Sequence, residues 1–402
     1  MKKLLKLIVF VFVSFFTFST CIFGLSLNSE KYILYNLDTD EVLLKKDSDV
    51  KASIASLTKI MSVIVAIENI DDYDKVITIT SDMLNGIAYD VAVTGFKVGD
   101  KVTVDDLLYS AIVASGADSV NALAYVVSGN TSKFVKLMND KSKELNMKNT
   151  NFTNVVGLYD SKHYSTCEDM GILVKYALKN KKFREIFGAN YYNTSNGIKL
   201  RSTISRYNDG KNNISYITGA KTGYLSKAGN CLASTAHISG IDYLLITLNS
   251  YKGKTSHVDD AVKVYNYYGN LYEKANVVLK NDEIVKIKVK YTKEKYIMIK
   301  ANQNIDVIMK KGFDKSKVSY DYDGKDAVTY FTKNGIKLGN VKVKYKGEVI
   351  SNFDLYYNEK DNVHFSLMSF ILSYSYVIII IVLIICAKKR SKKKRRKKIN
   401  LM

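Results

Sequence analysis

Hydrophobic residues recur at helical spacing in five segments between residues 56 and 180. In SLTKIMSVIVAIENI, five apolar residues fall on one face of a helix: Leu57, Ile60, Met61, Ile64 and Ile67. The same spacing predicts helices in TVDDLLYSAIVA and ADSVNALAYVVSG, which are joined through Ser115-Gly116, and in TSKFVKLMNDKSKELNM and TCEDMGILVKYALKN. We expect Thr131 to cap the fourth helix and Thr166 to lie near the start of the fifth.

Alternating apolar and polar residues predict strands on both sides of this helical region. KYILYNLDTDEVLLKKD contains two such runs around the turn LDTDE, which predicts a hairpin. GNCLASTAHISGIDYLLITLNS predicts two core strands around SGID. Helices between strand-rich ends are typical of an α/β (α+β) fold whose antiparallel sheet is closed by both termini. We assign this domain to residues 26–273.

The pattern changes at residue 274 and stays different to residue 360. Short alternating runs are separated there by Asn-Gly, Asn-Asp and Lys-Gly turns, which predicts a second, small all-β domain. This domain carries no cluster of serine, histidine or paired acidic residues. Any catalytic chemistry is therefore expected in the first domain.

Both ends of the chain have the pattern of membrane-directed segments. Three lysines precede an apolar stretch, and small residues follow at Gly24 and Ser26, which predicts a signal peptide at residues 1–25. Residues 365–387 carry no charge and are long enough for a transmembrane helix. Ten cations follow at once, so residues 388–402 are expected to form a basic cytoplasmic tail, with the body outside the cell membrane. The alternative is a buried core helix followed by a solvated charge run.

Composition adds limits to this picture. The formal net charge is +21, but much of it lies in the basic tail, so we expect no nucleic-acid partner. Of the four cysteines, only Cys167 and Cys231 lie in the exported body, where they could pair without forming a disulfide framework. The four histidines are isolated along the chain, and we predict no metal site and no cofactor.

A first candidate for chemistry is ASLTKIM, in which Ser56 and Lys59 lie three residues apart at a helix start. This spacing puts both side chains on one face, within hydrogen-bond reach. A serine hydroxyl becomes nucleophilic when a base takes its proton, and a lysine can be that base once burial lowers its pKa. Taken alone, the motif fits a helix cap beside a solvated lysine better than it fits an active site.

A second candidate is Lys221-Thr222-Gly223, which precedes a strand-like run. Lys221 would bring positive charge to the nucleophile and to a substrate carboxylate, and Thr222 would donate a hydroxyl to the same carboxylate. Gly223 would let the substrate backbone come close. The tripeptide alone is a weak signal.

In this order the two motifs resemble those of penicillin-binding proteins and class A β-lactamases. The chain is similar in particular to the low-molecular-weight D-alanyl-D-alanine carboxypeptidases, a family of serine peptidases, from about Ser26 to the end of the ectodomain. Four blocks carry the resemblance: ASLTKIM, GDKVTVDDLLYSAIVASGADSVNALA, NFTNVVGLYDSKHYSTCEDMGIL and TGAKTGYLSKAGNCLAS. It implies a penicillin-binding/β-lactamase-like transpeptidase domain, a small β-rich domain and a C-terminal membrane attachment.

The resemblance implies a serine-type D-Ala-D-Ala carboxypeptidase. Ser56 would attack the carbonyl between the last two D-Ala residues of a peptidoglycan stem pentapeptide, with Lys59 as proton acceptor. The backbone N–H groups of Ser56 and Tyr224 would form the oxyanion hole. Water would then hydrolyse the acyl-enzyme. The implied partners are the peptidoglycan stem peptide, β-lactam antibiotics that acylate Ser56, and the membrane.

The family's middle motif, S-x-N, is incomplete here. Ser115 matches the motif serine, with an implied role as a proton relay, but Ala117 stands where the family has asparagine. The literal match, Ser119 with Asn121, does not fit because residues two apart on a helix point to opposite faces. The alternative for Ser115 is a helix cap. The absence of the asparagine amide at position 117 bears on the efficiency of catalysis more than on the class of reaction.

Two other functions stay open. A β-lactamase would need a glutamate-positioned water, and no E-x-x-x-N block lies between the two motifs. A catalytically weakened wall-binding protein is suggested only by Ala117. We interpret His163 as a residue that fixes a loop, because Lys59 already supplies the base. Arg206 and Lys227 are expected on the solvated surface.

Overall fold

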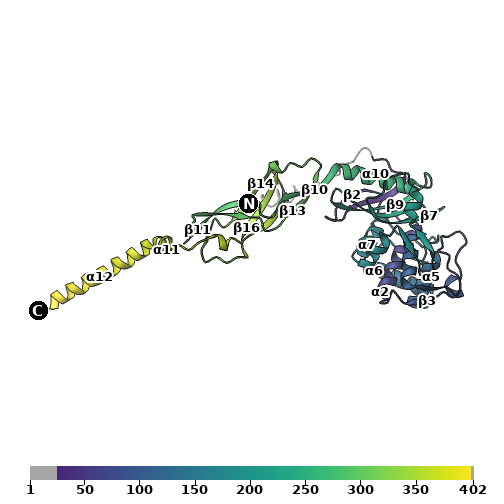
Figure 1. The fold of residues 1–402 in the computed structure, drawn as a ribbon, viewed down its shortest axis with the longest axis horizontal. Coiled ribbons are helices and arrows are strands. Elements are labelled where there is room, and N and C mark those ends of the chain that lie inside the picture. The colour runs from purple at the N-terminus through teal and green to yellow at the C-terminus, as the bar shows by residue number, and fades with distance from the viewer. Residues whose placement is uncertain (1–24, 400–402) are drawn as a thin grey trace, which may run out of the picture. The chain divides into compact units, whose positions relative to one another are not determined.

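The computed structural model describes residues 25–399 (Figure 1), and the predicted signal peptide lies outside these residues except for its last position. The chain divides between Leu271 and Tyr272 into two compact units, two residues before the expected boundary. Each unit has its own hydrophobic core. They are described separately below.

The first unit is built on a five-stranded antiparallel sheet of order β2-β1-β9-β8-β7. Its strands are β1 (Ser29–Asn36), β2 (Val42–Lys46), β7 (Ile217–Leu225), β8 (Gly229–Ile238) and β9 (Ile241–Ser250). The predicted hairpin forms β1 and β2, and the predicted strand pair forms β8 and β9. Because β7 is an edge strand of this sheet, one of its sides stays free to face the predicted site residues.

Helices and two short ribbons complete this unit. The helices are η1 (Ala55–Leu57), α2 (Thr58–Asn69), α3 (Ser81–Leu84), α4 (Val104–Val113), α5 (Ala117–Ser128), α6 (Thr131–Glu144), α7 (Cys167–Ala177), α8 (Lys181–Phe187), α9 (Thr203–Asn208) and α10 (Ser256–Leu271). The ribbons pair β3 (Val76–Thr78) with β4 (Lys101–Thr103), and β5 (Tyr191–Asn193) with β6 (Lys199–Arg201). The five predicted helices correspond to α2, α4, α5, α6 and α7.

Helices cover both faces of the sheet, with α10 on one side and α2, α6 and α7 on the other (Figure 1). Strand β9 shows how the sequence specifies this arrangement. Its residues Leu244 and Ile246 join the core around α2, while Tyr243 packs near Tyr265 of α10, with ring centroids 6.4 Å apart. These residues on both faces of β9 are thus apolar, which is expected of a strand that is buried on two faces.

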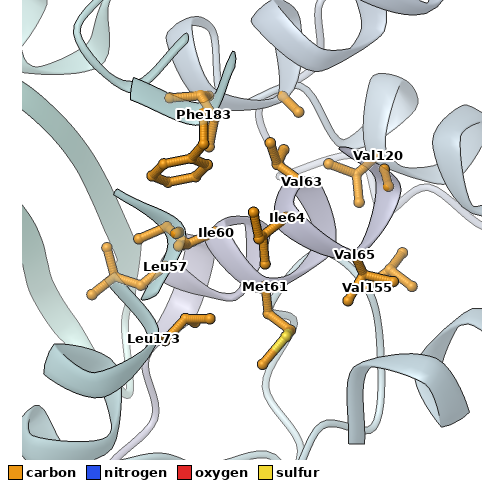
Figure 2. Packing of buried hydrophobic residues seen from close by; sticks show 14 of the residues in the cluster. Leu57, Ile60, Met61, Val63, Ile64, Val65, Val120, Val155, Leu173 and Phe183 are labelled. Atoms are coloured by element: carbon orange, nitrogen blue, oxygen red, sulfur yellow. The ribbon is translucent and has the colours of Figure 1, made fainter. Parts of the chain in front are cut away.

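Helix α2 is buried on all sides and not only on its predicted apolar face. Every residue from Thr58 to Ile67 is buried. Figure 2 shows its side chains reaching toward Val120, Val155, Leu173 and Phe183 of the surrounding segments. Water is therefore excluded from the side chains of residues 58–67, including the polar ones.

Side-chain caps fix two of the predicted helix starts. Thr166 lies at the start of α7, as predicted, and it caps the helix by accepting a hydrogen bond from the N–H of Asp169. The prediction for α6 is wrong by one residue, because Asn130 and not Thr131 accepts the N–H of Lys133. Asn130 has extended backbone angles and an amide oxygen of the right reach, and Thr131 is already the first helical residue.

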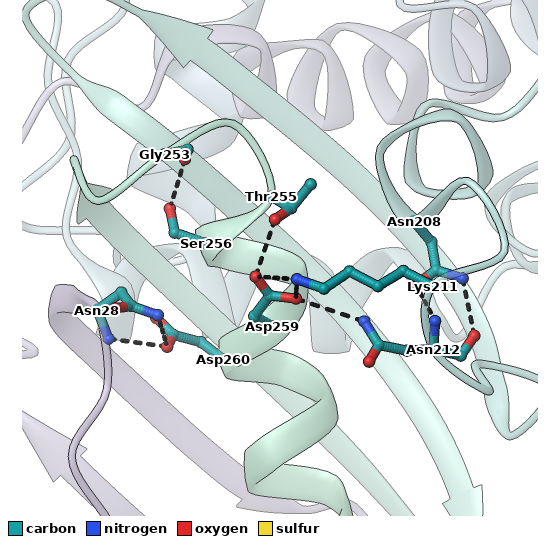
Figure 3. A network of polar contacts seen from close by, with 9 residues as sticks. All are labelled: Asn28, Asn208, Lys211, Asn212, Gly253, Thr255, Ser256, Asp259 and Asp260. Atoms are coloured by element: carbon teal, nitrogen blue, oxygen red, sulfur yellow. Dashed lines mark hydrogen bonds and ion pairs between the residues drawn. The ribbon is translucent and has the colours of Figure 1, made fainter.

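Buried and half-buried carboxylates tie α10 to distant segments of the first unit (Figure 3). Asp260 accepts hydrogen bonds from the backbone N–H groups of Asn28 and Ser29, at 2.8 and 2.7 Å, and so fixes the start of β1. Asp259 forms an ion pair with Lys211 at 2.9 Å. Lys211 follows α9, so this pair anchors the helix that carries Arg206 in the site described below.

The second unit is all-β up to residue 357, as predicted. Its strands are β10 (Tyr272–Val278), β11 (Glu283–Lys290), β12 (Tyr296–Lys300), β13 (Ile305–Lys310), β14 (Val318–Gly324), β15 (Ala327–Thr329), β16 (Ile336–Tyr345) and β17 (Glu348–Tyr357). They form the sheets β10-β13, β12-β11-β15 and β14-β16-β17. Strands β16 and β17 contribute six of the buried apolar residues of its core, and strands β10, β11, β12 and β15 contribute others.

The predicted transmembrane segment does not form one continuous helix. It is divided at Tyr374 into α11 (Leu367–Ser373) and α12 (Ser375–Ile399). Within residues 25–399 no single helix is long and apolar enough to cross a membrane, but α11 and α12 up to Arg390 meet that requirement as a pair, with a bend of 52°. The hydroxyls of Ser373 and Ser375 donate to backbone carbonyls one turn or less back, a contact that bends helices.

Candidate active site

Ser56 lies in the tight turn η1 that leads into α2. The preceding residue, Ala55, has a φ of 46°, a left-handed conformation that alanine adopts only when its surroundings hold it there. One such contact comes from Thr58, whose hydroxyl donates to the carbonyl of Ala55 at 2.8 Å. Another segment packs against the same carbonyl at Gly157, where a Cβ would come within 1.9 Å of that oxygen. The turn therefore presents Ser56 in one fixed orientation.

Lys59 is the immediate partner of Ser56. Its Nζ lies 2.8 Å from the Oγ of Ser56 and 2.9 Å from the carbonyl oxygen of Val156. The lysine is 2 % exposed, and burial lowers its pKa from 10.5 to about 7. A considerable fraction of the amine is thus neutral at neutral pH and able to accept the serine proton.

Ser115 and Lys221 form a second serine–lysine pair in the same site. The Nζ of Lys221 lies 2.8 Å from the Oγ of Ser115 and 2.6 Å from the carbonyl oxygen of Thr222. Lys221 is fully buried, and its pKa is well below the usual value because of burial and the nearby charges of Lys59 and Arg206. In the ligand-free site the positive charge expected on Lys221 is therefore disfavoured.

The edge strand β7 carries Lys221, Thr222 and Gly223 past the serine turn. A Cβ added to Gly223 would lie 3.0 Å from the backbone nitrogen of Ser56 and 3.2 Å from the Cβ of Ala55. Only glycine lets the strand approach this closely without displacing the turn. Tyr224 follows with its side chain 57 % exposed, which fits a wall of the site.

A cavity of about 420 Å³ joins these residues. Six of the seven predicted site residues line it: Ser56, Lys59, Ser115, Thr222, Gly223 and Tyr224. Lys221 lies beneath the surface and reaches the site through Ser115.

The cavity wall also contains two residues of α9 that were not predicted from the sequence to belong to the site. Tyr207 and Arg206 of α9 both line it. Arg206 is exposed, as expected, but at the cavity and not on a remote surface, and it donates to the carbonyl of Ala114 at 3.4 Å. Lys227 lies over the ring of Tyr159, 4.3 Å from its centroid. No spacing pattern identifies Arg206, because α9 is brought to the site by the fold alone.

His163 supports the serine turn from behind. Its Nδ1 accepts the backbone N–H of Thr153 at 3.1 Å, so the proton is on Nε2, which donates to the Oγ1 of Thr58 at 2.8 Å. Thr58 in turn bonds to Ala55. Burial lowers the pKa of His163 to about 4, so the ring is neutral. This geometry agrees with a loop-fixing histidine and leaves the role of base to Lys59.

The structure separates the two serines of the middle motif. Ser119 lies 2.7 Å from the hydroxyl of Thr94 and so binds the loop before α4, away from Ser56. The alternative in which Ser115 caps α5 is wrong: Gly116 is the N-cap residue, and the carboxylate of Asp118 accepts the N–H groups of the 94–96 loop. Ser115 is instead held with a φ of 63°. The hydroxyl of Ser115 therefore does not cap α5 and contacts Lys221 instead.

Residues 25–399 contain no group of three or more histidine, cysteine, aspartate or glutamate side chains placed to hold a metal ion. Cys167 and Cys231 are both buried free thiols. Burial raises the pKa of Cys231 to about 12, so it stays protonated.

Comparisons with known proteins place this geometry in context. Residues 20–252 match the family of D-alanyl-D-alanine carboxypeptidases, and residues 272–362 match the C-terminal domain of penicillin-binding protein 5. The D-alanyl-D-alanine carboxypeptidase DacF of Bacillus subtilis is 30% identical over 329 residues, covering 79% of this chain and 82% of that protein.

Two solved structures are also similar to this chain. A DD-transpeptidase of Streptomyces K15 is 27% identical, with a TM-score of 0.55 over 60% of this chain and 98% of its own. Penicillin-binding protein 6B of Escherichia coli shares the fold at 20% identity, with a TM-score of 0.64 over 84% of this chain and 98% of its own. The second of these covers both units.

Proposed function

Because this chain belongs to the D-alanyl-D-alanine carboxypeptidase family, we propose that it removes the terminal D-Ala of peptidoglycan stem pentapeptides through an acyl-enzyme on Ser56. The observation that carries this proposal is the contact between Ser56 and Lys59, whose atoms Oγ and Nζ are 2.8 Å apart. A serine hydroxyl in contact with a desolvated amine forms an activated nucleophile, because the neutral amine can accept the hydroxyl proton. The catalytic domain of such an enzyme acts outside the cell membrane.

In the acylation step Lys59 takes the hydroxyl proton of Ser56, and the Oγ attacks the carbonyl carbon of the penultimate D-Ala. The N–H groups of Ser56 and Tyr224 stabilise the oxyanion. The C–N bond then breaks, and the proton that Lys59 took from Ser56 passes through Ser115 to the leaving D-Ala amine, which returns Lys59 to its neutral form. Water afterwards hydrolyses the ester, with Lys59 again as the base, and regenerates the free serine.

The strand β7 supplies substrate binding in this proposal. The substrate's terminal carboxylate would meet the hydroxyl of Thr222, and the charge of Lys221 would attract it from beneath the surface. Gly223 would make room for its backbone, and Tyr224 would form the wall. An entering carboxylate favours the charged form of Lys221, whose pKa is otherwise lowered. A charged Lys221 would in turn keep Lys59 neutral while it acts as base.

The test of this function uses the full chain and a fluorescent penicillin. We expect a covalent label on the wild type and none on the Ser56→Ala variant, because a β-lactam resembles the D-Ala-D-Ala end. Release of D-Ala from a stem pentapeptide then identifies a carboxypeptidase. Rapid nitrocefin hydrolysis without D-Ala release would favour a β-lactamase instead, and an unlabelled wild type would favour a weakened wall-binding relative.

The same proposal includes attachment to the membrane through α11 and α12, with the tail after residue 387 in the cytoplasm. The composition of the pair and the cations that follow support this orientation. We expect the full chain to stay with membranes after alkaline carbonate washing, and a chain ending at residue 364 to be released. Release of the full chain by the wash would contradict the attachment.

A further inference from the structure

An unpaired amide lies beside the active-site cavity. Asn121 of α5 is 9 % exposed, and within residues 25–399 its carboxamide has no hydrogen-bond partner. A carboxamide that has no protein partner on a side chain that is nine-tenths buried keeps its donor and its acceptor for a group that enters from the accessible side. The part of the side chain that stays accessible opens into a second cavity, of about 230 Å³, which we call the side cavity.

The side cavity adjoins the site of Ser56. Val91, Val156 and Leu158 line both cavities, and Val156 is the residue whose carbonyl binds Lys59. The residues that line the side cavity include several hydroxyl and amide side chains but no charged one. Its chemistry therefore suits a neutral, hydrogen-bonding group such as a peptide amide and not a carboxylate or an ammonium group.

Helix geometry relates Asn121 to the incomplete middle motif. Ala117 and Asn121 lie four residues apart on α5, and both line the side cavity. Residues at this spacing share a helix face, and helical side chains lean toward the N-terminus. The carboxamide of Asn121 thus leans toward the position where an asparagine at 117 would have placed its own amide.

We propose that Asn121 supplies the substrate-binding amide that is absent at Ala117, one helical turn further along α5. Its carboxamide hydrogen-bonds a neutral peptide amide on the acyl side of the scissile bond, in the stem peptide or in the acylamino group of a penicillin. This role rests on the proposed function of Ser56. It explains how the site keeps a binding amide although the motif position itself holds alanine.

The test compares two β-lactams on the full chain. Benzylpenicillin carries an acylamino group, whereas 6-aminopenicillanic acid has a free amine at the same position. We expect Asn121→Ala to slow acylation of Ser56 by benzylpenicillin about tenfold, the effect of one lost hydrogen bond, and to change acylation by 6-aminopenicillanic acid less than about twofold. Adding Ala117→Asn to this variant should restore most of the benzylpenicillin rate.

A purely structural Asn121 would give a different result, since a disturbed fold slows both β-lactams equally. Equal losses, or no loss with either compound, would overturn the proposal while wild-type acylation leaves the proposed function intact. A wild type that forms no Ser56-dependent adduct would overturn the proposed function and this role together. The Asn121→Ser variant, which keeps a small polar group, provides the same comparison if Asn121→Ala does not fold.

Discussion

The Nζ of Lys221 lies 2.8 Å from the Oγ of Ser115, although the two residues are 106 positions apart in the sequence. Both are almost completely buried, at 0 and 4 % exposure. A pair held this firmly can pass a proton between the lysine and the leaving group without rearranging. Ser119, four residues beyond Ser115, has no such contact and bonds to Thr94 instead.

This difference predicts opposite behaviour of two serine variants. Ser115→Ala should lower the turnover of a stem pentapeptide by about tenfold to a hundredfold, because it removes the relay. Ser119→Ala should lower the thermal midpoint, since it breaks a buried hydroxyl pair, and leave turnover nearly unchanged. Steady-state release of D-Ala and thermal unfolding measure the two effects. Equal losses of turnover would refute the assignment.

The pH dependence of acylation should follow Lys59. Its pKa is lowered to about 7, so the amine is protonated and inactive below that pH and neutral above it. We expect the rate of Ser56 acylation by benzylpenicillin to rise with pH up to about 7 and then to level off. Stopped-flow measurement between pH 5 and 9 checks this. A rate independent of pH over that range would exclude Lys59 as the base.

Two buried histidines should make the fold sensitive to acid. The pKa values of His163 and His257 are both lowered by burial to about 4, whereas an unfolded histidine titrates near 6.5. Between these values the unfolded chain binds more protons, so stability is lost as the pH falls from about 6.5 to 4. Each histidine accounts for at most about 3 kcal/mol of this loss.

The control for this prediction removes the titrating groups. Thermal unfolding of the His163→Gln and His257→Gln double variant should depend less on pH between 4 and 6.5 than that of the wild type. His163→Gln alone should also slow acylation, because it disturbs the contact with Thr58 behind the serine turn. An unchanged pH dependence in the double variant would show that other groups cause the acid sensitivity.

Gly223→Ala should separate strand β7 from the serine turn. The added methyl group would lie 3.0 Å from the nitrogen of Ser56, a backbone atom that cannot yield easily. We expect acylation to fall by about tenfold or more. Gly197→Ala is the matched control: its φ of 90° makes alanine costly, but nothing lies within 4 Å, so stability should fall without a change in acylation.

The sequence predicts those parts of the site that depend on local spacing. Ser56 and Lys59 meet because residues three apart share a helix face, and the helices themselves follow from apolar periodicity. The Ser115–Lys221 contact was expected only from the resemblance, since no local rule relates a loop after α4 to a strand so far along the chain. Arg206 was placed on the surface for the same reason.

The errors at helix boundaries have local physical causes. Asn130 and Thr131 are both good capping residues, and only the backbone angles decide between them. The division of the predicted span at Tyr374 depends on serine hydroxyls that turn back to the helix backbone, an effect that hydrophobicity alone does not register. The periodicity of apolar residues thus predicts whether a segment is a helix or a strand more reliably than it predicts the residues at which the element begins and ends.

The burial of residues 58–67 of α2 links the reactivity of the site to the integrity of the fold. Lys59 is a usable base only while the surrounding side chains keep water away, since a hydrated lysine regains its proton at neutral pH. Loosening of the core around this helix would therefore deactivate Ser56 by restoring the proton on Lys59. A molecule with a loosened core therefore loses its activity and does not become an unselective hydrolase.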